Sequence, residues 1–149
     1  MYKSCAFTGH RDFLEDLNYS LLDSVIENLI KTGTEVFYCG MAVGFDLSAA
    51  ETVIKLKEVY DVKLIACIPC PEQSFNFSES NLRRYERIIK NSDEVIYISP
   101  HYFEGCMLKR DRFMVDNCDV LVCYLRKNNG GTYYTVNYAK RQGIKIIEL

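Results

Sequence analysis

The stretch VFYCGMAVGFDLSAA (residues 36–50) passes from an apolar run, through two glycines, into a helical pattern. Its first part, 36–40, is β-branched, aromatic and continuous rather than alternating, which is typical of a strand covered on both faces. Gly40 and Gly44 permit a tight turn, and Asp46 is suited to cap a helix. The apolar positions of that helix are Leu47, Ala50, Val53 and Ile54. A strand that leads through a glycine turn into a helix is the first half of a βαβ unit.

The same alternation fills the rest of the 149 residues. Further strands are predicted at 5–8, 63–68, 94–99, 120–125 and 144–149, and helices at 17–32, after caps at Asp46 and Ser78, at 107–117 and at 132–142. Gly33 and Gly143 are the expected helix stops. The pattern predicts an α/β fold: a single Rossmann-like, doubly wound, mainly parallel sheet of about six strands with helices on both faces. We expect residues 1–149 to form one domain.

Composition narrows the classes of function. Net charge is −2, which argues against a general polyanion binder. No apolar run approaches the roughly 20 residues that span a membrane, and the N-terminus lacks a signal-peptide pattern, so we expect a cytoplasmic protein that does not bind membranes. The seven cysteines lie mostly in apolar runs, which favours buried, reduced thiols. Cys67 and Cys70 form a C-x-x-C pair without a second ligand pair, so packing is favoured over a metal or redox site.

Polar residues and glycines gather after the predicted strands. Ligands of open parallel sheets bind outside the carboxyl ends of the strands, so these residues are candidates for one site. Arg110 lies near the start of the predicted 107–117 helix, at the same edge of the sheet. For Arg110 or Arg112 there are two interpretations, a contact with the ligand or a solvated surface charge. The candidate nucleotide- and phosphate-binding residues are Thr8, Gly9, His10, Arg11, Gly40, Gly44, Asp46, Ser99, Tyr102, Arg110, Gly130, Gly131 and Thr132.

Two segments predict phosphate cradles. In CGMAVGFD (39–46) and NNGGT (128–132), glycines let the backbone approach a ligand where a helix begins, and a helix N-terminus offers free N–H groups. Asp46 has two interpretations here, a helix cap or a site residue. No G-x-G-x-x-G follows the first strand, and no G-x-x-x-x-G-K-[ST] occurs, which disfavours ordinary NAD-dependent dehydrogenases and ATPases.

An ordered set of motifs resembles a known family. TGHR (8–11), GMAVGFDLSAAE (40–51), RRYERI (83–88), KRDRFMVD (109–116) and GGTYYTVNYA (130–139) resemble the YpsA-like family of the SLOG superfamily, which is named for the Smf/DprA DNA-processing proteins and the LOG cytokinin-activating enzymes. G-x-A-x-G-x-D and GHR are similar to motifs of the Smf proteins, and Arg110 with GGT resembles motifs of the LOG enzymes. The resemblance implies a Rossmann-like fold, a site for nucleotides or nucleotide-derived ligands, and a homo-oligomer.

One position departs from the LOG pattern. Their catalytic glutamate corresponds to Thr135, which we expect one turn into the last helix, facing the ligand; Asp46, Asp111 and Asp116 are the remaining nearby carboxylates. We therefore expect non-catalytic binding or sensing of a small nucleotide ligand, ADP-ribose-like or a cyclic signalling nucleotide, with no required cofactor. The alternatives are a LOG-like nucleotide phosphoribohydrolase and a single-strand DNA binder. Nucleic acid is the less favoured partner, because NLRRYERIIK (81–90) is the only short basic run.

Overall fold

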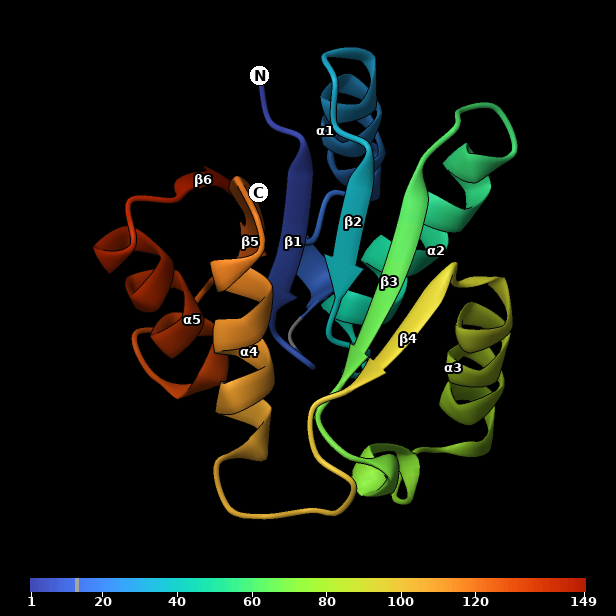
Figure 1. Ribbon diagram of the computed structural model, residues 1–149, viewed down its shortest axis with the longest axis vertical. Coiled ribbons are helices and arrows are strands. Elements are labelled where there is room, and N and C mark those ends of the chain that lie inside the picture. Colours follow the sequence, from blue (N-terminus) through green and yellow to red (C-terminus); the bar gives the residue numbers. More distant parts are fainter. Residues whose placement is uncertain (13) are drawn as a thin grey trace.

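A computed structural model describes residues 1–12 and 14–149, and its centre is a six-stranded sheet in which every neighbouring pair is parallel (Figure 1). The strands are β1 (Ser4–Gly9), β2 (Val36–Cys39), β3 (Lys63–Ile68), β4 (Glu94–Tyr97), β5 (Val120–Tyr124) and β6 (Lys145–Glu148). Their order across the sheet is β4-β3-β2-β1-β5-β6. The predicted parallel α/β sheet is confirmed.

Five α-helices of the described chain cover the two faces of the sheet (Figure 1). The helices α1 (Tyr19–Lys31), α2 (Phe45–Lys57) and α3 (Glu79–Asn91) share one face, and α4 (Cys106–Asp116) and α5 (Gly130–Arg141) share the other. Short 3₁₀ turns, η1 (Leu14–Asp16) and η2 (Pro71–Ser74), follow β1 and β3. The strands step outward from β1 to β4, and the chain then returns across the sheet through α4 to β5. With right-handed crossovers, this reversal moves the later helices to the opposite face.

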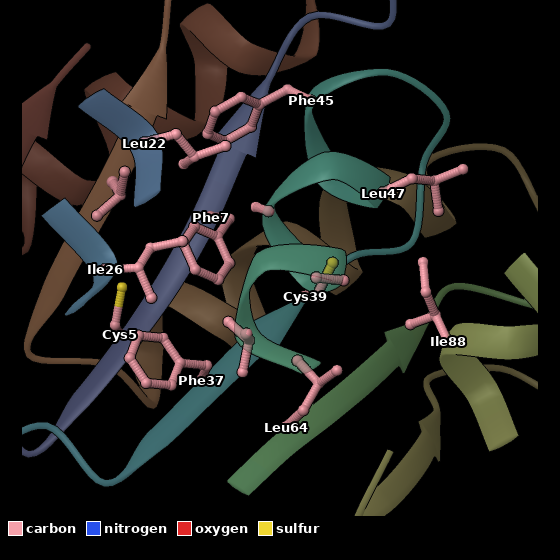
Figure 2. Close-up of a cluster of buried hydrophobic side chains, with 14 of the residues drawn as sticks. Cys5, Phe7, Leu22, Ile26, Phe37, Cys39, Phe45, Leu47, Leu64 and Ile88 are labelled. Carbon is pink, nitrogen blue, oxygen red and sulfur yellow. The ribbon is translucent and has the colours of Figure 1, made fainter. Parts of the chain in front are cut away.

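Aliphatic and aromatic side chains fill the space between the sheet and the first three helices (Figure 2). Phe7 of β1 stacks on Phe37 of β2 with ring centroids 5.9 Å apart, and Phe45 of α2 stacks on Tyr124 of β5 at 6.0 Å. All four side chains are fully buried. Because Phe45 is the first residue of α2, this packing fixes the start of that helix against the carboxyl ends of β1 and β5.

The helix boundaries correct three expectations. The first helix begins at Tyr19 rather than at 17, because the Asn18 side chain accepts the Leu21 N–H at 2.9 Å. The last helix begins at Gly130, two residues before the expected start. Asp46 lies inside α2, whose N-cap is Gly44 with φ 85°, so its interpretation as the helix cap was wrong.

The predicted cap of the third helix and the two predicted helix stops are confirmed. The Ser78 side chain caps α3 by accepting the Asn81 N–H at 3.2 Å. Gly33 and Gly143 follow α1 and α5 with positive φ. All seven cysteines are buried and unbridged, and the Sγ atoms of Cys70 and Cys106 lie 4.0 Å apart. Across 1–12 and 14–149, no group of three or more His, Cys, Asp or Glu residues could hold a metal ion, and no helix is long and apolar enough to cross a membrane.

Candidate functional site

The chain reverses its direction of travel across the sheet at β1, which has β2 on one side and β5 on the other. Ligands of open α/β sheets bind at such a switch point, beyond the carboxyl ends of the strands. A cavity of about 280 Å³ lies there and is called the first cavity below. Its walls come from the segment 8–12, the first turns of α2 and α4, and the segment that begins α5.

The start of α5 opens into the first cavity. Asn129 is its N-cap but forms no side-chain capping hydrogen bond, and Gly130 has φ 88°. A Cβ atom added at Gly130 or Gly131 would meet nothing within 4 Å. The first N–H groups of a helix have no partner inside the helix, so they are free to bind an anion. Gly130, Gly131 and Thr132 all line the first cavity, and the phosphate cradle at this helix start stays a prediction.

The second predicted cradle, at the start of α2, is closed by the protein itself. A Cβ atom at Gly44 would lie 2.6 Å from the Arg11 carbonyl oxygen, and one at Gly40 would lie 2.9 Å from the Arg110 guanidinium. The Phe45 N–H donates to the His10 carbonyl at 3.1 Å. Gly40 and Gly44 are thus required for close packing of protein on protein, and the predicted approach of a ligand to them was wrong.

Arg110 is buried at the side of the first cavity and is already paired. Its Nε donates to Asp111 Oδ1 at 2.6 Å, and its guanidinium also donates to the Gly40 carbonyl. Asp111 in turn accepts the Thr135 hydroxyl at 3.1 Å. Arg110 thus contributes positive charge to a wall of the cavity, while its hydrogen bonds hold α4 to the turn after β2. Arg112 points elsewhere and donates to the Tyr134 hydroxyl at 2.8 Å.

Asp46 is a buried carboxyl on the wall of the first cavity. Its Oδ2 accepts the Ala42 N–H at 3.3 Å, whereas its Oδ1 is buried and has no hydrogen-bond partner among the described residues. Burial raises the pKa of Asp46 to about 7, although the neighbouring Arg110 charge opposes this shift. The backbone of the preceding turn is strained, since Met41 has φ 65°, a backbone conformation that residues other than glycine rarely adopt.

The segment after β1 closes the cavity on the other side. Thr8 and His10 are buried, and His10 Nε2 accepts the Arg126 N–H at 2.8 Å, which joins the ends of β1 and β5. Burial, followed by the Lys127 charge, lowers the pKa of His10. A neutral ring that accepts at Nε2 carries its proton on Nδ1. A side chain at Gly9 would overlap the Phe45 ring, so this glycine serves packing.

Arg11 differs from Arg110 because it is exposed and, within the described part of the chain, forms no hydrogen bond or ion pair. It lines the first cavity and also a larger one of about 680 Å³, the second cavity, beyond the end of β3. Tyr102 lines only the second cavity. Ser99 lines neither cavity, and its hydroxyl donates to the His101 carbonyl at 2.6 Å. The predicted single cluster is therefore divided.

Thr135 does not face the cavity. It is 1% exposed, and its hydroxyl is 2.8 Å from the Gly131 carbonyl and 3.1 Å from Asp111 Oδ2. The expectation that it faces a ligand was wrong, because α5 begins at Gly130 and turns this position inward. Lys127 and Asn129 line the first cavity and were missed, although the run RKNNGGT (126–132) that contains them pointed to this edge.

The fold is that of a Rossmann-like α/β protein, and a cavity lined largely by polar residues lies at the switch point of its parallel sheet. The chain belongs to the YpsA family, described as the YspA SLOG family, whose model matches residues 4–146. The resemblance recognised from the motifs is confirmed.

Several curated proteins are similar to this chain in sequence, and two solved structures are similar to it in fold. The UPF0398 protein lin2003 of Listeria innocua is 28% identical over 93% of this chain and 83% of its own length, and BH1768 of Halalkalibacterium halodurans is 30% identical over 76% and 62%. The fold is similar to that of DNA processing protein A from Streptococcus pneumoniae, with TM-score 0.73 at 20% identity, and to its Helicobacter pylori counterpart, with TM-score 0.71 at 19%. The two structural matches cover 99% and 97% of this chain. They cover 53% of the Streptococcus pneumoniae chain and 64% of the Helicobacter pylori chain.

Proposed function

We propose that this protein binds a nucleotide or nucleotide-derived ligand, whose phosphate occupies the first cavity. The observation that carries the proposal is Asp46 Oδ1, a buried polar atom without a partner in the described structure, on the wall of a cavity that the open start of α5 also lines. Buried polar atoms are nearly always hydrogen-bonded, so an unpaired one beside a cavity indicates a group that a ligand supplies.

The chemistry of the cavity suits a phosphate. The N–H groups at the start of α5 donate to its oxygens, and Arg11 supplies an unpaired charge. An ionised Asp46 would repel the phosphate, but burial keeps its pKa near 7, so the neutral acid is available. Since Oδ2 already accepts from Ala42, the proton belongs on Oδ1, where it is donated to the ligand.

Gly131→Val tests this assignment. The valine side chain enters the space into which a Cβ at 131 would project, so we expect calorimetric titration to show binding of AMP by the parent and none by the variant. Lys140→Val introduces the same residue at an exposed position of the same helix and should bind AMP normally. Circular dichroism should show both variants folded. Undiminished binding of AMP by folded Gly131→Val would place the site elsewhere.

Hydrolysis of an N-glycosidic bond is a second candidate, and the environment of Asp46 favours it. General acids work best with a pKa near the working pH, and Asp46 has a pKa of about 7, whereas Asp111 is committed to Arg110 and Thr135. Release of adenine from AMP by the parent, abolished in Asp46→Asn, would establish this activity. We expect binding without turnover, because the position of the LOG glutamate is occupied by the buried Thr135.

Single-stranded DNA is a third candidate ligand, because the Helicobacter pylori neighbour is described as having a single-stranded DNA binding mode. The basic run 81–90 gives it little support, since Arg83 pairs with Glu79 and Arg84 with Glu51. We therefore expect a twelve-residue oligodeoxyadenylate to compete with AMP only weakly. Binding of the oligomer more tightly than AMP, with a strong salt dependence, would favour DNA as the ligand.

A further inference from the structure

The second cavity adjoins the first at the carboxyl edge of the sheet. Arg11 and Met107 line both cavities, so one ligand can extend from one to the other. The η2 turn and the loop between β4 and α4 contribute to its walls, and Figure 1 shows this loop beyond the ends of the strands. Ligand cavities usually measure about 300–1,000 Å³. The first cavity, at about 280 Å³, is small for a whole nucleotide, and the second, at about 680 Å³, is not.

Gln73 of η2 lines the second cavity, and a hydrogen bond defines the orientation of its amide group. Its Nε2 donates to the Gly40 carbonyl at 3.0 Å, and its Oε1 is buried without a partner in the parts of the chain that the structure describes. A carbonyl only accepts hydrogen bonds, so the amide nitrogen must face Gly40 and the amide oxygen must face away. Gln73 therefore offers an acceptor, and a ligand group that satisfies it has to be a donor.

The same cavity carries exposed aromatic side chains. Phe75 is 74% exposed and Tyr102 is 60% exposed, although both are large and apolar. Aromatic side chains at a binding site provide surfaces on which nucleobases stack, and the stacking tolerates every base because each has a π-face. Stacking of a base on these rings would therefore add affinity for every nucleobase. A hydrogen bond to Gln73 Oε1 would favour some bases over others.

We propose that the second cavity is a base subsite in which Gln73 selects a nucleobase that carries an exocyclic amino group, adenine or cytosine, over its oxo counterpart. This inference rests on the proposed function, because the phosphate of the same ligand occupies the first cavity. The amino group donates to Gln73 Oε1, and the ring stacks on Phe75 or Tyr102. An oxo group at the same place would bring its oxygen, a second acceptor, next to Gln73 Oε1, which would then have no hydrogen-bond donor.

The test compares matched nucleotides by calorimetric titration of the full chain. AMP and IMP differ in an amino or oxo group at one ring carbon, and CMP and UMP form a second pair. We expect the parent to bind the amino member of each pair about tenfold more tightly, the effect of one hydrogen bond. Gln73→Leu should bring each pair to within twofold. Phe75→Ala should weaken AMP and IMP about equally and keep their ratio.

The possible results test the base subsite separately from the phosphate site of the proposed function. Equal binding of AMP and IMP by the parent, lost in Gly131→Val, would leave the phosphate site standing and overturn the base subsite. If Gln73→Leu lowers the affinities for AMP and IMP by the same factor, so that AMP is still preferred, then Gln73 is not the residue that selects the base. Absence of binding of all four nucleotides would overturn both proposals. The parent comparison needs no substitution, so it decides even if a variant fails to fold.

Discussion

Replacing Asp46 with asparagine should abolish a pH dependence of stability that a buried acid imposes. Asparagine has nearly the same shape as the protonated carboxyl, and its amide oxygen can still accept the Ala42 N–H that Asp46 Oδ2 accepts. The one property removed is the ability to ionise. We therefore expect a folded Asp46→Asn protein whose stability relative to the parent depends on pH.

The size and sign follow from the pKa of Asp46. Burial raises it from 3.8 in the unfolded chain to about 7 in the folded protein. Each unit corresponds to about 1.4 kcal/mol, so the full effect is on the order of 4 kcal/mol. Between these values the unfolded chain has released the proton and the folded protein retains it, so stability falls as pH rises from about 4 to about 7. Asp46→Asn does not experience this loss.

Urea denaturation at several pH values between 4 and 8 measures the effect. The difference in free energy of unfolding, variant minus parent, should grow by roughly 4 kcal/mol across this range and level off above pH 7. Asp61→Asn removes an exposed carboxylate and serves as the control, without a comparable change. Asp46→Asn and parent curves that stay parallel from pH 4 to 8 would refute the argument, because the carboxyl would then ionise as it does in the unfolded chain.

Three further changes probe the same region. Arg110→Ala leaves Asp111 buried without its ion-pair partner. We therefore expect urea denaturation to show a free energy of unfolding that is lower by about 3–5 kcal/mol, whereas a residue that only contacts a ligand would leave the stability of the free protein unchanged. Gly9→Ala forces a methyl group against the Phe45 ring and should lower stability by about 1–3 kcal/mol, visible as a lower Tm; an unchanged Tm would contradict the packing. Affinity for AMP should fall between pH 6 and 8 in the parent, as Asp46 loses its proton, and should fall less in Asp46→Asn.

The order of the elements could be predicted because each strand and helix has a local pattern. The run 63–68 is apolar after Lys63, and β3 has the same bounds. The cap at Ser78 and the stop at Gly143 are equally local, since their effects reach only a few residues along the chain. The position of Gly131 at the wall of the first cavity was predictable for the same reason, because a glycine pair that follows a strand and begins a helix is a local signal.

The roles of other site residues depend on contacts between distant parts of the chain. Whether Gly40 faces a ligand or a protein group depends on Arg110, which lies 70 positions away and donates to its carbonyl. Asp46 suited a helix cap by position, and only the burial of its side chain reveals an unpaired oxygen. Gln73 lies in a short segment after β3 with no distinctive pattern. The role that we propose for it depends on the amide orientation that the Gly40 carbonyl imposes.

The Gly40 carbonyl accepts hydrogen bonds from both Arg110 and Gln73, and this redundancy bears on how the protein can change over evolutionary time. If Gln73 is replaced, Arg110 still satisfies the oxygen, so no buried acceptor is stranded. If Arg110 is replaced, Asp111 loses its counter-ion. Position 73 is therefore tolerant and position 110 is constrained. If position 73 selects the nucleobase as proposed, descendants of one ancestral chain could change that selection through a single substitution and inherit the proposed phosphate site unaltered.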